Sequence, residues 1–275
     1  MKIWIITSSS DNLYLFRFLH EYNFSYHIWY DQEGWHRWDK AVDFVQKRIE
    51  QWFDALIEQW IQKCILPASW ELVFLGIEKY KKYILPLFST YIIEQVLPSS
   101  RVGKLWFIWD WCDIQNQDAL KILCAQYQCT ENQKNTKIFH QPFVYWSKQT
   151  SLRKYFLISL GRKDWMMHNV VKHDLRYFTD AWVDTLIPLN YGYFAYDSTI
   201  AKFFRTKKCR WHRLTKIAWV YNALVKEYKE DTYAVTISYT GVLDQLTSEK
   251  KWVWLLDKGK QYPIIYKSSR IFSIL

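Results

Sequence analysis

Short apolar segments alternate with amphipathic segments along most of the chain, and this alternation constrains the fold most strongly. The apolar segments at residues 3–8, 25–30 and 104–109 have the length of buried strands, and residues 39–61 carry apolar side chains every three or four positions. Strands that alternate with helices form βαβ units, whose strands lie parallel in one sheet. The sequence therefore predicts an α/β fold with mainly parallel sheets flanked by helices.

The same patterns place the remaining elements. Further strands are expected at 64–67, near 85–87, within an otherwise loop-like stretch at 129–150, at 183–189 and at 233–238. Further helices are expected at 11–22, 70–82, 113–127, 164–181, 195–205, 215–228 and 242–257. Ligands of such folds bind outside the carboxyl ends of the strands. A site is therefore expected at residues 7–11, 31–38, 67–71, 109–113 and 189–193.

Composition excludes several classes of protein. Half the residues are hydrophobic and 23% are charged, as in ordinary globular domains, and no apolar run reaches the ~18 residues of a membrane span. The first apolar segment is shorter than a signal-peptide core, so a cytoplasmic protein is expected. The five cysteines are scattered without a C-x-x-C pair, which argues against disulfides and a zinc site. The net charge of +10 is spread along the chain, which favours a lysine-rich surface over nucleic-acid binding, the alternative left open.

Glycine is scarce and tryptophan is abundant, with 7 Gly and 17 Trp. A typical chain of this length has about 19 Gly, and turns need them because only Gly enters positive φ cheaply. With Gly in place of Trp, segment 102–111 becomes a strand followed by a Gly-rich turn. We hypothesise that many Trp codons are UGA, which some bacterial lineages read as glycine. Trp38, Trp106 and Trp109 should then lie at turns or strand ends. The alternative is a truly Trp-rich protein, such as a carbohydrate binder.

Four segments, in order along the whole chain, resemble motifs of the glutamate racemases, members of the aspartate/glutamate racemase family. Residues 3–8 resemble I-G-I-F-D-S, 31–40 resemble D-T-A-R-V-P-Y-G-N-K, 106–114 resemble G-V-I-G-T-E-G-T-I, and 238–241 resemble the closing Y-x-T-G turn. Trp falls on Gly places of these motifs at Trp4, Trp38, Trp106 and Trp109. Thr7 stands in the place of an Asp, and Ser8 matches a Ser.

The resemblance implies two similar α/β lobes with a ligand cleft between them. Residues 1–97 with 208–275 would form the first lobe, and residues 98–207 the second. It implies an isomerase that supplies D-glutamate for peptidoglycan without cofactor or metal. The partner would be a small amino acid or dicarboxylate, with no nucleic acid or membrane involved, and a homodimer is compatible with it.

The two catalytic cysteines of the family are missing. The family uses one thiol on each face of the substrate α-carbon, in the motifs A-C-N-T and G-C-T-H-Y-P. Alignment places Ala68 on the first cysteine, Asn190 on the second and Gly192 on the histidine. Alanine has no titratable proton and an asparagine amide is no base at pH 7. UGA decoding does not explain the losses, because neither position is Trp.

Two functions therefore remain open: an enzyme with altered chemistry, and a non-catalytic relative that binds a small anion or amino acid. Replacement groups for the thiols would be Cys112 or His36, although a packed Cys and a surface His are the simpler interpretations. Cys64 lies at the wrong end of its strand. We expect Ala68 and Asn190 to face each other across the cleft, within roughly 15 Å. The resemblance and the expected strand ends place the following residues at the ligand: Thr7, Ser8, Arg37, Trp38, Ser69, Trp70, Asp110, Asp113 and Tyr191.

Overall fold

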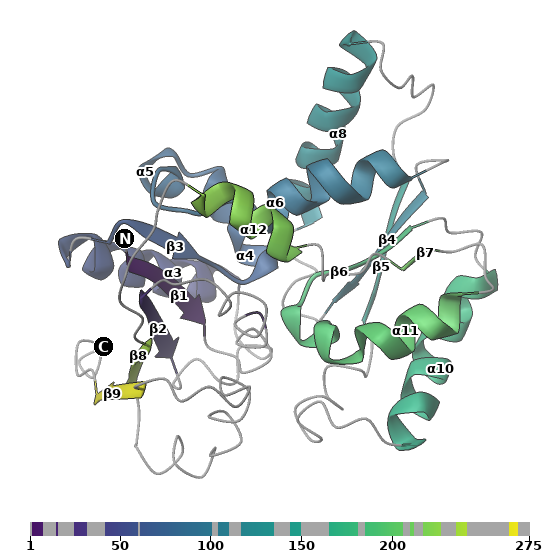
Figure 1. Ribbon diagram of the computed structural model, residues 1–275. Helices are drawn as coiled ribbons and strands as arrows, with labels where there is room; N and C mark the ends of the chain where they lie inside the picture. Colours follow the sequence, from purple (N-terminus) through teal and green to yellow (C-terminus); the bar gives the residue numbers. More distant parts are fainter. Residues whose placement is uncertain are drawn as a thin grey trace.

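The fold contains two parallel β-sheets, flanked and joined by helices (Figure 1). The computed structural model describes residues 2–7, 15, 25–31, 42–59, 61–100, 104–109, 117–134, 144–149, 165–180, 185–205, 210–211, 217–226, 235–240 and 264–268. The first sheet has the order β3-β1-β2-β8-β9, with β1 Lys2–Thr7, β2 Ser25–Asp31, β3 Lys63–Ile65, β8 Val235–Thr240 and β9 Ile264–Ser268. The second has the order β5-β4-β6-β7, with β4 Lys104–Trp109, β5 Val144–Gln149, β6 Thr185–Pro188 and β7 Arg210–Trp211. The predicted α/β class is confirmed.

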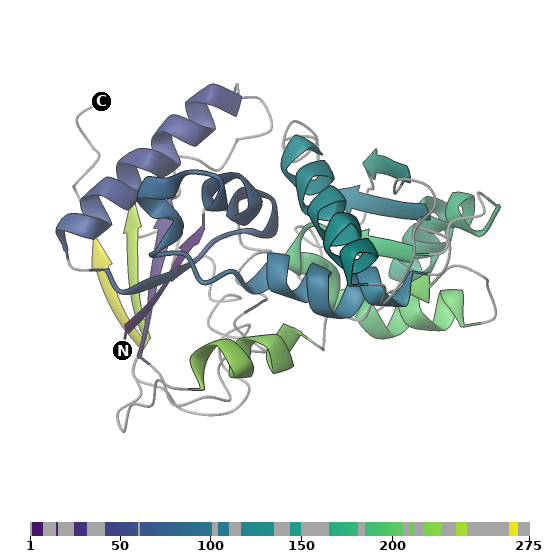
Figure 2. The same cartoon turned by 90° about the horizontal axis from the view of Figure 1, so that it is seen from above.

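Both faces of the first sheet are buried, because successive side chains of a strand point to opposite faces. On β1, Trp4 and Ile6 pack into a smaller core with helix α3, Val42–Glu58, which lies along the outer face of the sheet (Figure 2). Ile3 and Ile5 point the other way, into a larger core. The continuous apolar run of β1 follows from this burial on two sides.

The larger core continues from the first sheet into the second. It contains Ile5 and Ile28 from the first sheet, Phe107 and Ile187 from the second, and side chains of the helices between them. These are α4 Ala68–Leu75, α6 Leu87–Tyr91 and α12 Ile217–Val225. Figures 1 and 2 both show α6 and α12 between the two sheets. One apolar interior thus holds the two halves together.

The second sheet carries its own helices. They are α8 Gln117–Gln133, α10 Trp165–Asp180, the 3₁₀ turn η4 Tyr191–Tyr196 and α11 Asp197–Phe204. Strand β7 pairs with β6 at Arg210–Trp211, so the second sheet extends past residue 207. We therefore propose that the return to the first lobe lies after Trp211. None of the helices in the described ranges is long and apolar enough to cross a membrane.

Several predicted elements need correction. The helix expected at 70–82 is two helices, α4 and α5 Glu78–Lys81, because α4 ends at Gly76. The strand expected near 85–87 is reduced to a bridge between Ile84 and Cys64; Pro86 then starts α6, as proline favours a helix N-terminus. Helix α8 extends into the stretch predicted as loop, whose single strand is confirmed as β5.

Some features had no counterpart in the prediction. The chain after α6 continues as η2 Ile92–Val96 and η3 Leu97–Ser99, and the edge strands β7 and β9 were not expected. The helix expected at 242–257, and all of the helix expected at 11–22 except Leu15, lie outside the described residues. Trp109 ends β4 as expected, but Trp106 lies inside β4, buried against Tyr177 and Phe178, so a turn there was wrong. Trp38 lies outside the described residues.

The smaller core gives a direct test of the packing of α3. Phe53 is fully buried and stacks on Phe74 and Tyr80, with ring centroids 5.5 and 5.0 Å away. We expect Phe53→Ala to lower the free energy of unfolding by about 3–5 kcal/mol in urea denaturation, through lost burial and a residual cavity. Phe44→Ala, on the same helix but 51% exposed, is the matched control and should change it by less than about 1 kcal/mol. Equal losses in both variants would contradict the placement of α3.

Candidate functional site

Two predicted site residues lie at one edge of the first sheet. Thr7 is the last residue of β1 and is 1% exposed. Neighbouring β3 ends at Ile65, and after Leu66 and Pro67 the helix α4 begins at Ala68. Because β1 and β3 are parallel, with Ile5 opposite Ile65, Thr7 and Ala68 follow the carboxyl ends of adjacent strands. This is the edge where α/β folds bind ligands.

The first turn of α4 separates its side chains between the two cores. Ala68 is fully buried in the larger core, whereas Trp70 packs in the smaller core with Phe74, at a ring distance of 6.2 Å. The structure therefore does not bring Trp70 to the same side as Ala68. Ser69 is the second residue of the helix. The methyl group of Ala68 offers no proton donor or acceptor.

Asn190 occupies the equivalent place in the second sheet. It follows the carboxyl end of β6, is 5% exposed, and its Oδ1 accepts a 2.7 Å hydrogen bond from the N–H of Gly192. A side chain that binds the backbone two residues later forms an Asx turn, and here the turn starts η4. The carboxamide has a structural partner and no titratable proton. Its neighbour Tyr191 is buried, and its ring meets Phe88 edge-on at 6.4 Å.

A buried carboxylate that the sequence did not single out joins α4 to α6 and acts on Tyr191. Glu71, one turn after Ala68 on α4, is fully buried. Its Oε2 accepts a 2.8 Å hydrogen bond from the N–H of Phe88. Its Oε1 accepts hydrogen bonds from the N–H and the hydroxyl of Ser89, at 2.7 and 2.8 Å. Glu71 thus satisfies donors that the start of α6 would otherwise leave without helical partners.

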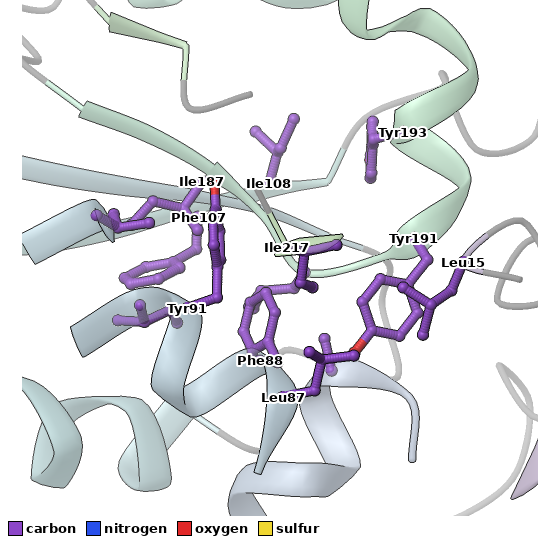
Figure 3. Close-up of a cluster of buried hydrophobic side chains, with 14 of the residues drawn as sticks. Leu15, Leu87, Phe88, Tyr91, Phe107, Ile108, Ile187, Tyr191, Tyr193 and Ile217 are labelled. Carbon is purple, nitrogen blue, oxygen red and sulfur yellow. The ribbon is translucent and has the colours of Figure 1, made fainter. Parts of the chain in front are cut away.

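Burial dominates the electrostatics of Glu71. Removal from water disfavours the charged form and raises the pKa of Glu71 to about 7, although the hydrogen bonds from Ser89 and Phe88 offset part of the effect. Burial also raises the pKa of Tyr191, and the charge of Glu71 raises it further. Figure 3 shows Tyr191 directed towards Leu87 and Phe88 at the start of α6. We call Glu71, Phe88, Ser89 and Tyr191 the Glu71 junction.

The sequence held one signal for Glu71. It is the single charged residue in the otherwise apolar helix Ala68–Leu75, and a charge among core side chains requires a partner. The partners, however, are 17 and 18 residues away along the chain. Sequence spacing alone does not reveal them.

None of the cysteines that the structure describes lies at the strand ends where the resemblance places thiols. Cys64 lies inside β3, and burial raises the pKa of its thiol far above the usual range. Cys124 is buried in α8 and Cys129 is exposed on the same helix. No group of three or more His, Cys, Asp or Glu that could hold a metal occurs within the described ranges. Other predicted residues lie outside these ranges: Ser8, His36, Arg37, Trp38, Asp110, Cys112 and Asp113.

Solved structures of glutamate racemases share the fold of this chain. The enzyme isoform from Bacillus anthracis superposes with a TM-score of 0.71 at 14% identity, over 98% of this chain and 97% of that one. The Francisella tularensis enzyme, solved with D-glutamate, gives 0.71 at 15% identity over 99% and 98%. The Campylobacter jejuni enzyme gives 0.69 at 13% identity over 95% and 100%. Comparison with protein-family models and with curated sequences finds no match. The likeness establishes the two-lobed racemase fold.

Glu71 should make the stability of the protein depend on pH. Its folded pKa of about 7 exceeds its ordinary value of 4.5, so the folded chain binds more protons than the unfolded chain between these values. The contribution of Glu71 to stability should therefore fall as pH rises from 4.5 to 7 and then level off, by up to about 3 kcal/mol. The measurement is the difference in unfolding free energy between the wild type and Glu71→Gln, from urea titrations at pH 4.5, 6, 7 and 8.

The control for this measurement is Glu78→Gln on α5, whose side chain is 90% exposed. Its difference from the wild type should not vary with pH. A flat or rising difference for Glu71→Gln across the same pH range would contradict the raised pKa.

Proposed function

We propose that this chain is a glutamate-racemase-like protein that keeps the ligand site of the fold and lacks its two-thiol chemistry. The observation that carries the proposal is the placement of Ala68 and Asn190 directly after the carboxyl ends of parallel strands in the two sheets. These are the positions at which the resemblance puts the two cysteines. A cytoplasmic protein that binds an amino acid or dicarboxylate, without cofactor, is the corresponding biological role.

Racemisation by two bases requires an acceptor on one face of the α-carbon and a donor on the other. Ala68 provides neither. The Asn190 carbonyl already accepts the Gly192 N–H, and its amide does not titrate. The loss of both groups removes about 10²- to 10⁴-fold of rate for each of them.

Binding of an anionic ligand requires less than catalysis. No side-chain cap of α4 is present among the described residues, and the first N–H groups of a helix have no partner within the helix. The amides of Ala68 and Ser69 are therefore suited to a ligand carboxylate, which also gains from the positive end of the helix dipole. Thr7, at the end of the neighbouring strand, would add a hydroxyl.

An enzyme with altered chemistry is the second candidate, with Cys112 or His36 as the replacement base. The favouring observation is their position in segments that match the family motifs after β2 and β4. Nucleic-acid binding rests on the net charge of +10 alone. The activity measurement below distinguishes the first two candidates.

We expect no exchange of the α-proton of D- or L-glutamate or aspartate with heavy water above the uncatalysed rate. The protein should nevertheless bind one of these dicarboxylates in isothermal titration calorimetry. Exchange is followed by NMR, using a gene that encodes glycine at any UGA codon. Exchange at an enzymatic rate in the unmodified protein would contradict the loss of chemistry, and separate Cys112→Ser and His36→Gln variants would then locate the base.

Restoring thiols provides the positive control. Ala68→Cys with Asn190→Cys should raise the exchange rate above that of either single variant, because each thiol serves one face. Asn190→Cys also removes the acceptor of the Gly192 N–H, at a cost of about 1–3 kcal/mol in stability, so the fold is checked by circular dichroism. Cys129→Ser controls for an exposed, unrelated thiol.

We also propose that many of the 17 tryptophans are glycines in the source organism. Two observations support this proposal. Glycine is scarce, and the family motifs have Gly at the positions that align with Trp4, Trp38, Trp106 and Trp109. The codons at positions 106 and 109 should be UGA. UGG at both positions would refute this proposal, and the burial of Trp106 inside β4 would then reflect a true tryptophan.

A further inference from the structure

We propose that the Glu71 junction, where α4 and α6 meet Tyr191 of η4, is a pH-sensitive contact that opens to water when Glu71 is ionised. Glu71 belongs to α4, directly after β3 of the first sheet, and Tyr191 belongs to η4, directly after β6 of the second. Both meet at the start of α6. This inference concerns the fold itself and does not depend on a bound ligand.

The geometry makes Glu71 the polar centre of an apolar contact. Its two oxygens take three hydrogen bonds from two consecutive residues of α6. Leu87, Phe88, Tyr191 and Ile217 belong to the larger core, and Figure 3 shows these four close together. α4 and α12 pack against α6. A shift of α6 relative to α4 would therefore break the bonds of Glu71 and expose apolar surface together.

The described residues place few ionisable groups on the elements that pack around the junction. Tyr91 is the last residue of α6. Burial raises its pKa, and the charge of Asp197 on α11 raises it further. On η4, burial raises the pKa of Tyr191, and the charge of Glu71 raises it further. On α12, the hydroxyl of Tyr221 pairs with that of Tyr26 at 2.7 Å. On α8, which also packs against α4, the charge that acts on Tyr127 is that of Glu131.

No cation among the described residues contributes to the pKa of Glu71, which is set by burial and by the hydrogen-bond donors at the start of α6, chiefly those of Ser89 and Phe88. Within the part of the chain that the structure describes, the ionised carboxylate is therefore stabilised by hydrogen bonds and by no counter-ion. A buried charge without a counter-ion gains free energy when water reaches it. Ionisation consequently favours the open form of the junction, and protonation favours the closed form.

The direction and size of the effect follow from linkage. One proton separates the closed from the open form, so the opening equilibrium constant should rise by at most tenfold per pH unit. The rise should begin above pH 4.5, the ordinary value for Glu71, and level off near pH 7, its value in the closed form. The protection of the α6 amides against hydrogen exchange should fall by the same factor.

Native-state hydrogen exchange of the Phe88 and Ser89 amides, read by NMR from pH 5 to 8 and corrected for intrinsic exchange, tests the proposal. We expect their protection factors to fall between threefold and tenfold per unit from pH 5 to 7 and to stay constant above. They should also be lower than that of the Phe53 amide in α3, which reports global unfolding. Unchanged or increasing protection with pH, or protection equal to that of Phe53 throughout, would overturn the proposal.

Three variants test whether ionisation of Glu71 causes the pH dependence of amide protection. Glu71→Gln should abolish the pH dependence at Phe88 and Ser89, whereas Glu78→Gln should leave it intact. Ser89→Ala removes one donor to the carboxylate and should move the plateau to higher pH, which provides a test if Glu71→Gln does not fold. The proposal would be overturned if the protection factors of Glu71→Gln still depended on pH. It would also be overturned if those of Ser89→Ala levelled off at the same pH as in the wild type, because another group would then cause the effect.

Discussion

The burial of both faces of the first sheet is the constraint on which the remaining structure depends. A parallel sheet needs cover on each face, and Ile3 and Ile5 face away from α3. The helices α6 and α12 share their core with Phe107 and Ile187 of the second sheet. The two halves therefore share one interior, and every polar group inside it needs a partner. The hydrogen bonds of Glu71 are a consequence of this requirement.

The sequence predicted the parts of the fold that depend on local patterns. Strand β4 and the strand ends at Ala68 and Asn190 follow from apolar periodicity and short motifs, which need no knowledge of distant residues. Edge strand β9 was missed, since its partner β8 ends more than 20 residues earlier. Trp106 was expected at a turn or strand end on compositional grounds, although it lies inside the strand that was predicted at 104–109.

The strand ends could be predicted from the sequence, whereas the partners of the side chains there could not. Motifs located Ala68 and Asn190 after two strand ends, and elementary acid–base properties show that neither side chain can serve as a base. The structural role of Asn190 as acceptor for Gly192 requires coordinates, because Asn at a strand end equally fits a ligand contact. Glu71 escaped prediction for the same reason, since its donors lie on another helix. Polar groups whose partners are remote in sequence mark the limit of inference from one chain.

The position of Glu71 also bears on what a thiol at position 68 would encounter. Ala68 and Glu71 are three residues apart on one helix, so they lie on neighbouring parts of its surface. A thiol at 68 and an ionised carboxylate at 71 would repel each other when both are charged, which raises the pKa of the thiol and weakens it as a base at pH 7. Alanine at 68 avoids that conflict. An ionised Glu71 therefore disfavours a thiolate at the start of α4. In the described structure Glu71 accepts its hydrogen bonds from α6, and position 68 is an uncharged alanine.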